Sequence, residues 1–251
     1  MIPVSEGNIG AYWLARKEHP EVCAGRLAHC LLGLRELSPL FGQWLHARPG
    51  GRVEIPVDSS DVLASIFAAS RNKSDFPPGN PIEDLGCNVA LITDHQLKLQ
   101  TSVQTTCGMY RNDPAILNNC LLKFAPEGEL SYRAVSWETK RKALEILIQA
   151  WDPDWAVLRS QTLRKSLQAG RKGVVVEPYF GWISFVSERR GEITEAIRQK
   201  FQIEPIPGRG SLVYATSEII DEQSPRHLGA ALELYSLLEN AGLLRREKSP
   251  S

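Results

Sequence analysis

The strongest constraint on the fold is a run of apolar residues with helical spacing near the start of the chain. From Cys23 to Leu37 such residues recur every three or four positions, which places them on one face of a helix. Ser38 and Pro39 end the run, because the residue before a proline avoids the helical region. Trp13 and Trp44 flank this helix, so we expect the opening of the chain to be a packed scaffold.

Hydrophobic spacing and turn residues indicate the remaining elements. Helices are expected near residues 40–45, 59–67, 144–151, 162–168 and 225–241. Strands are expected at 52–56, 87–93, 97–106, 120–124, 157–158, 182–187 and 211–216. Asp94, His95 and Gln96 are expected to form a tight link between two of these strands. Polar and apolar residues alternate from Leu97 to Val103, which predicts a sheet with one face in solvent.

The last expected helix has clear end signals. Ser224 is suited to cap it, Pro225 to be its first residue, and Gly242 to stop it. Its expected buried face consists of Leu228, Leu232, Tyr235 and Leu238.

Strands and helices are intermixed without regular alternation, which favours an α+β fold over a doubly wound parallel sheet. We expect a mostly antiparallel sheet with helices packed to one side, in two halves of similar size. The segment Ala125–Gly128 is the best boundary, so the expected halves are residues 1–125 and 126–251, forming one compact unit.

Charge and hydropathy exclude several classes of protein. The 251 residues contain 29 basic and 29 acidic side chains, so the net charge is zero; a nucleic-acid-binding protein usually has a basic excess. No apolar run is long enough to cross a bilayer, and the start of the chain lacks the pattern of a secretory signal. We therefore expect a cytoplasmic protein that binds neither nucleic acid nor membranes.

No catalytic or metal-binding pattern stands out. The five cysteines include no Cys-x-x-Cys pair, so reduced thiols are expected rather than a zinc site or disulfides. The five histidines lie in no recognisable signature, and the residues from Asp152 to Asp154 are expected to end a helix and start a turn. We expect no catalytic residue, no cofactor and no metal.

One segment is strongly acidic. Between residues 54 and 94 there are seven acids and only two bases, a local net charge of −5. Such a surface would suit a basic protein partner, because complementary charge speeds association and selects the partner. The candidate partner-binding residues are Glu54, Asp58, Asp61, Asp75, Glu83, Asp84 and Asp94.

Three ordered blocks carry a resemblance to a known family. The first combines Trp13-x-x-Arg16 with Cys23-Ala24, Pro39-Leu40-Phe41 and Trp44. The second is Trp151-Asp152-Pro153-Asp154-Trp155-Ala156-Val157, and the third is Gly181-Trp182-Ile183-Ser184-Phe185. In this order the blocks resemble the immunity protein 52 family of bacterial polymorphic-toxin systems. The family's usual Trp-Gly-Pro-Arg opening stands here as Trp13-Leu14-Ala15-Arg16.

The resemblance implies a non-enzymatic antitoxin that binds its cognate toxin inside the producing cell. Members of the family are found beside toxins with a restriction-endonuclease-like nuclease domain, often delivered by type VI secretion. Inhibition could occlude the toxin's active groove or cover a surface used for its assembly or loading. A small-molecule enzyme and an effector-loading adaptor or chaperone remain alternatives. The sequence leaves open the toxin, the contact surface and the oligomeric state.

Overall fold

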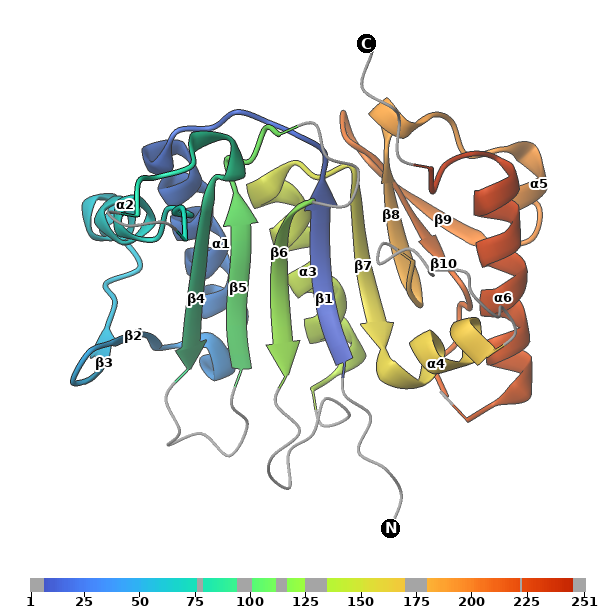
Figure 1. Cartoon of the computed structure of the whole chain (residues 1–251). Helices are drawn as coiled ribbons and strands as arrows, with labels where there is room; N and C mark the ends of the chain where they lie inside the picture. The colour runs from blue at the N-terminus through green and yellow to red at the C-terminus, as the bar shows by residue number, and fades with distance from the viewer. Residues whose placement is uncertain are drawn as a thin grey trace.

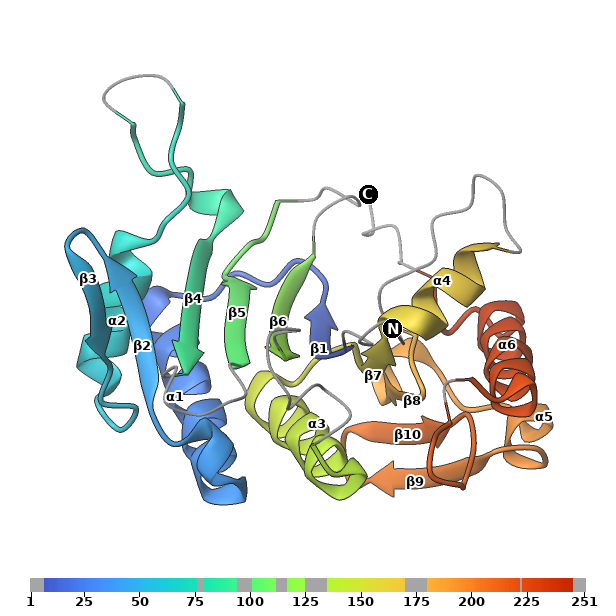
Figure 2. The same ribbon diagram turned by 90° about the horizontal axis from the view of Figure 1, so that it is seen from below.

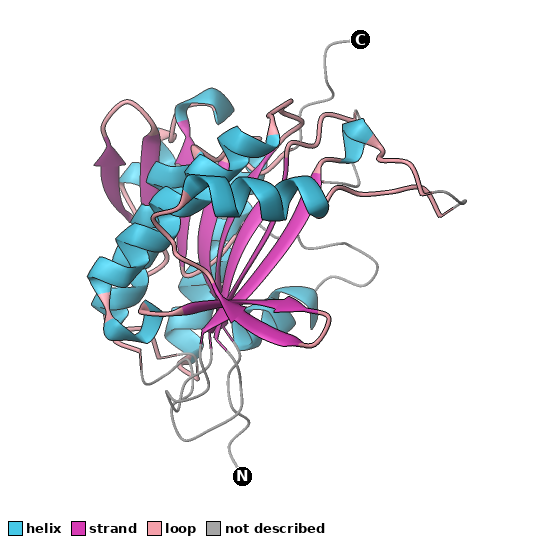
Figure 3. Cartoon of the chain, turned by 90° about the vertical axis from the view of Figure 1, so that its left-hand side faces the viewer, coloured by secondary structure: helices cyan, strands magenta, loops and turns pink. Residues whose placement is uncertain are grey.

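The framework of the molecule is an antiparallel β-sheet, seen in a computed structural model (Figure 1). The structure describes residues 7–75, 79–93, 101–111, 117–124, 135–169, 180–221 and 223–245. The strands are β1 (Gly7–Trp13), β2 (Trp44–Arg48), β3 (Gly51–Glu54), β4 (Cys87–Thr93), β5 (Thr101–Cys107), β6 (Asn118–Phe124), β7 (Trp155–Ser160), β8 (Ile183–Ser187), β9 (Gln202–Ile206) and β10 (Gly210–Tyr214). Their order across the sheet is β3-β2-β4-β5-β6-β1-β7-β8-β10-β9. The sheet twists strongly, so that β9 and β10 cross the direction of β4 and β5 (Figures 2 and 3).

The helices cover opposite faces at the two ends of the sheet (Figure 2). One face carries α1 (Pro20–Leu37), α2 (Ser60–Ala69) and α3 (Trp137–Trp151). The other carries α4 (Gln161–Ala169), α5 (Glu195–Arg198) and α6 (Pro225–Asn240), packed on the strands from β7 to β10. The predicted α+β fold with an antiparallel sheet is confirmed. Each half has its helices on one side, but the two halves use opposite sides.

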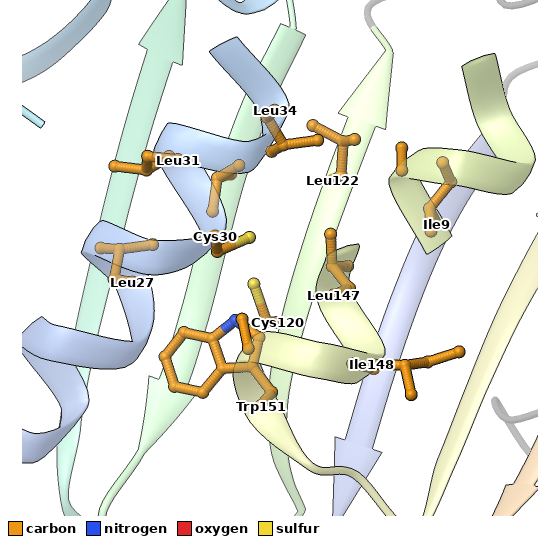
Figure 4. Close-up of a cluster of buried hydrophobic side chains, with 14 of the residues drawn as sticks. Ile9, Leu27, Cys30, Leu31, Leu34, Cys120, Leu122, Leu147, Ile148 and Trp151 are labelled. Atoms are coloured by element: carbon orange, nitrogen blue, oxygen red, sulfur yellow. The ribbon is translucent and has the colours of Figure 1, made fainter. Parts of the chain in front are cut away.

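The predicted stripe of α1 forms the centre of the larger core. Cys23, Leu27, Cys30, Leu31 and Leu34 are fully buried. They meet α3 and the inner face of β6, where Cys30 and Cys120 point toward each other (Figure 4). Burying a leucine-sized side chain contributes about 1.5–3 kcal/mol, so this stripe is a major source of stability.

The strand β1 was not predicted, although it lies in the middle of the sheet. It pairs with β6 on one side and β7 on the other, and thereby joins the two predicted halves. Glycine disfavours strands, and Gly7 and Gly10 obscured the pattern. Here Gly10 has a steric reason, because a Cβ at this position would lie 2.7 Å from the Tyr12 hydroxyl. The division into halves at residue 125 stays a prediction.

Two local predictions were wrong. The expected helix at 40–45 is a single 3₁₀ turn, Pro39–Phe41, after which Trp44 and Leu45 begin β2. On α6, Leu232 is 40% exposed. The residues of α6 that are buried are His227, Ala231, Leu234, Tyr235 and Leu238. The strand β9 was missed, and the expected link at 94–96 and boundary at 125–128 lie outside the described residues.

The first two sequence blocks meet where α3 ends. Trp13 stacks on Trp151 with ring centroids 5.1 Å apart, and Arg16 Nη2 donates to the Trp151 carbonyl at 2.9 Å. As predicted, the helix ends here: Asp152 adopts the left-handed conformation with φ 45°, an end that asparagine and aspartate tolerate better than most residues.

The two aspartates after this helix tie three elements together. Asp154 Oδ2 accepts from the Leu14 N–H at 2.9 Å, and its Oδ1 lies 3.2 Å from Arg189 Nε. Asp152 pairs with Arg189 at 3.0 Å and with Arg209 at 3.2 Å. Together these contacts, which we name the aspartate clamp, fix the ends of β1, α3 and β8 relative to each other and to the start of β10.

Replacing Asp154 by alanine should destabilise the protein by about 2–3 kcal/mol, because it leaves the Leu14 N–H and the Arg189 Nε–H without their acceptor. Asp154 is only 8% exposed, so water cannot fully substitute. Urea unfolding followed by tryptophan fluorescence measures the change. Glu192→Ala, at an exposed position, is the control and should change the free energy of unfolding by less than about 0.5 kcal/mol. Equal stability of the two variants would contradict the role of the clamp.

Candidate partner-binding surface

The sheet keeps one face in solvent over β4, β5 and β6, on the side opposite α1 and α3 (Figures 1 and 2). Inward residues of these strands are buried and outward residues are exposed or half-buried, as the predicted alternation requires. We call the outward set the open face. It consists of Asn88, Ala90, Ile92, Ser102, Gln104, Thr106, Asn119, Leu121 and Lys123.

Hydrogen bonds hold the polar side chains of the open face in place. Thr106 Oγ1 donates to Asn88 Oδ1 at 2.5 Å, and Asn88 Nδ2 donates to Asn72 Oδ1 at 2.8 Å. Lys123 Nζ donates to Gln104 Oε1 at 2.8 Å. Side chains ordered in this way lose less conformational entropy when a partner binds.

The open face ends at Tyr12, where the second core begins. Tyr12 lies opposite Asn119 on one side and Trp155 on the other. Its ring covers Gly10, and burial raises the pKa of its hydroxyl above the usual tyrosine value. From this line onward, α4 and α6 cover the sheet.

A second boundary is a pair of antiparallel segments between α2 and β4, which we call the arm (residues 71–75 and 79–86). Asn72 organises its base, because its N–H donates to the Gly86 carbonyl at 3.1 Å and its side chain to the Leu85 carbonyl at 2.6 Å. The bridge between Lys73 and Pro81 continues the pairing outward. The arm projects on the same side of the sheet as the open face (Figure 2).

The predicted acidic residues divide between the outer edge of the sheet and the arm. Glu54 ends the edge strand β3, Asp58 lies in the following loop, and Asp61 in the first turn of α2; all three are exposed. Asp75 and Glu83 are exposed on the arm. Asp94 lies outside the described residues.

Asp84 differs from the other acids because its carboxylate is paired with an arginine of the same chain. Arg111 binds it through two hydrogen bonds of 2.8 and 3.0 Å, and this guanidinium holds the pKa of the carboxyl below its usual range. The Asp84 carbonyl also accepts from the N–H groups of Tyr110 and Arg111. Asp84 therefore fixes the base of the arm to the end of β5.

A cavity of about 320 Å³ lies beside this base, between the arm and the start of α1. Its lining mixes cations and carboxylates, including Lys17, Arg71, Glu18 and Glu83. Lys17 Nζ lies 4.9 Å from the centre of the Tyr110 ring, and Glu18 is paired with Arg16 and Arg26 at 3.0 and 2.8 Å.

The cysteines and His227 are buried. All five cysteines are buried and free; burial raises the pKa of Cys87 to about 11, so its nucleophilic thiolate is scarce at neutral pH. His227 accepts from the Asp221 N–H at 3.0 Å beside the start of α6. Among the described residues, no three His, Cys, Asp or Glu side chains gather closely enough to hold a metal ion.

No described helix is both long and apolar enough to span a bilayer. The surface described above consists of hydrogen-bonded polar groups and exposed carboxylates, which is the chemistry of the polar rim of a protein–protein interface.

A comparison with known protein families identifies the family of this chain. The family described as Immunity protein 52 matches residues 7–247, nearly the whole length. The chain belongs to this family. Among solved structures, the chain is similar to the Pseudomonas aeruginosa T6SS protein PA0821, with a TM-score of 0.54 and 11% identity, over 96% of this chain and 76% of that one. That likeness is one of fold. No curated protein matches the chain.

The sequence pointed to the acids but not to the open face as a surface. Alternation in β5 indicated a solvent-exposed side, yet nothing local showed that α4 and α6 would cover only the other end. The pairing of Asp84 with Arg111, which are 27 positions apart, also had no local signal.

Replacing Arg111 by alanine should raise the pKa of Asp84 toward the ordinary aspartate value, because the guanidinium is the largest cause of its lowering. Carboxyl-carbon NMR during a pH titration measures this. A lowered carboxylate pKa stabilises the fold above the unfolded-state pKa and loses that effect as pH falls through the folded value. The wild-type arm should therefore loosen only in acid, and an unchanged Asp84 titration in the variant would refute the pairing.

Proposed function

We propose that this protein is the immunity partner of a secreted nuclease-type toxin, which it binds and neutralises in the cytoplasm of the producing bacterium. Membership of the immunity protein 52 family supports binding of a cognate toxin, and the similar PA0821 is described as a T6SS protein. The observation that carries the proposal is the set of exposed carboxylates on the edge strand β3, at the start of α2 and on the arm.

A nuclease offers a basic groove to the phosphate backbone of its substrate. An acidic surface that enters this groove competes with the nucleic acid and is steered toward it by long-range attraction. The carboxylates supply the steering, while the ordered amides and hydroxyls of the open face supply hydrogen bonds at short range.

Four of the acids are better candidates for contact with a partner than Asp84. Asp58, Asp61, Asp75 and Glu83 are exposed and have no ion pair with another described residue, so their charge is available to a partner. The Asp84 carboxylate already forms an ion pair with Arg111, and replacing Asp84 would disturb the base of the arm. A fair test therefore leaves Asp84 unchanged.

Reversing charge on two pairs of acids should weaken toxin binding. We expect Asp58→Lys with Asp61→Lys, and Asp75→Lys with Glu83→Lys, each to lower the association rate about tenfold or more at low salt, because steering is lost. Surface plasmon resonance with the catalytically inactive toxin measures the rates. The wild-type rate should fall steeply with salt, and the rates of the variants less so.

The matched control is Glu192→Lys with Glu195→Lys. Glu192 is exposed before α5 and Glu195 lies in its first turn, the same local settings as Asp58 and Asp61 before and in α2. This control changes net charge equally, so its rate should stay near the wild-type value. If the control and the acid variants bind alike, the carboxylates are not the contact. Binding that leaves nuclease activity intact would instead indicate a surface used for toxin assembly or loading.

Co-expression tests protection directly. Cells that express the toxin encoded beside this protein's gene should form colonies only when the wild-type protein is present. A variant that combines the two acid-pair changes should lower the colony count by orders of magnitude. The Glu192 and Glu195 variant should protect. Western blots confirm equal amounts of each protein, and failure of the wild type to protect would refute the proposed function.

A further inference from the structure

The edge strand β3 is complementary to itself. Its residues Gly51, Arg52, Val53 and Glu54 are all exposed, and it ends the sheet on the side of the β2–β3 hairpin, at the far left of Figure 1. An exposed edge strand offers unpaired N–H and C=O groups to another strand. We propose that two copies of this chain pair through β3, antiparallel and centred on Val53.

The hydrogen-bond pattern fixes which groups face outward. Ile55 N donates to the Trp44 carbonyl at 2.8 Å, in register with the pairing of Val53 and His46. Hydrogen-bonded positions alternate along an antiparallel pair. Gly51, Val53 and Ile55 therefore turn their main-chain groups toward β2, while those of Arg52 and Glu54 point away from the sheet.

Only one antiparallel register of two copies suits these outward groups. When Val53 faces Val53 of the second copy, Arg52 lies opposite Glu54 and each such pair exchanges two main-chain hydrogen bonds. A register centred on Arg52 or on Glu54 sets like charges opposite one another, which is destabilising. The charge order of β3 thus selects the Val53-centred pairing.

The side chains of β3 favour the same Val53-centred register as its main-chain groups. Arg52 and Glu54 lie on one face of β3, and neither has an ion pair with another described residue of its own chain. On the other face Val53, 45% exposed, meets its counterpart. Charged residues usually protect an edge from pairing, but these two attract a second copy in the opposite direction.

The other edge of the sheet is less suited to pairing. The strand β9 contains Pro205 in its interior, which has no N–H to donate and is typical of an edge that stays unpaired. Association through β3 therefore closes after two copies instead of growing into a fibre.

The pairing has a consequence for the open face. Because Arg52 and Glu54 of opposite copies share one face, the two sheets continue into each other with the same side up. Both open faces then lie on one side of the dimer. The strand is short, so we expect a weak, concentration-dependent dimer rather than a permanent one.

Sedimentation velocity over a wide range of protein concentration tests this without any toxin, so its result is independent of the proposed function. The wild type should form a reversible dimer. Arg52→Glu and Glu54→Arg should each weaken it about tenfold or more, because each turns both cross-copy pairs into like charges. An equimolar mixture of the two variants should dimerise again, since their strands are complementary, and so should the double variant R52E/E54R.

The control is Glu192→Arg, exposed and far from β3, which should dimerise like the wild type. Circular dichroism confirms that each variant is folded. A wild type that stays monomeric at every concentration would overturn the proposal. So would a dimer that survives the single substitutions, or a mixture that fails to restore it, because either result places the contact elsewhere.

Discussion

The arrangement of the whole sheet depends on the two carboxylates that follow α3. Asp154 binds the main chain just after β1 and the side chain of Arg189, and Asp152 binds Arg189 and Arg209. These side-chain bonds add to the main-chain bonds of the same reversal from α3 into β7, in which the Asp154 N–H donates to the Tyr12 carbonyl and the Ser187 N–H to the Asp154 carbonyl. Trp13 and Arg16 of the first block of family resemblance meet Trp151 of the second block at this point. They are architectural, so shared motifs alone do not locate the surface that meets a partner.

Local sequence patterns were sufficient to predict the helices and strands that have a clear hydrophobic periodicity or clear end signals. The helix after Pro20, the strand Cys87–Thr93 and the capped start of α6 follow from periodicity and end signals. It was insufficient for β1, because the residues that make Gly7–Trp13 a strand are those of β6 and β7. It also failed at Trp44, where aromatic stacking with Phe41 at 6.5 Å accompanies a strand rather than a helix.

The sequence also indicated only part of the candidate surface. Counting charges identified the acidic stretch, and the structure leaves most of its described carboxylates exposed. Counting could not show that Asp84 is neutralised by Arg111, since their contact is made only after β5 folds beside the arm. Nor could it show that one sheet carries helices on opposite faces at its two ends, which is what leaves the open face uncovered.

The central place of β1 determines when the fold can form during synthesis. Residue 8 pairs with residues 123 and 159, and the N–H of Leu14 meets an acceptor 140 positions away. Non-local pairings of this kind are slow and carry a large loop-closure cost. The first strand must therefore wait, unpaired, until about half of the chain, up to the end of β6, has left the ribosome. Folding therefore cannot proceed strictly in order from the amino terminus, because β1 takes its place in the sheet only after β6 and β7 have been made.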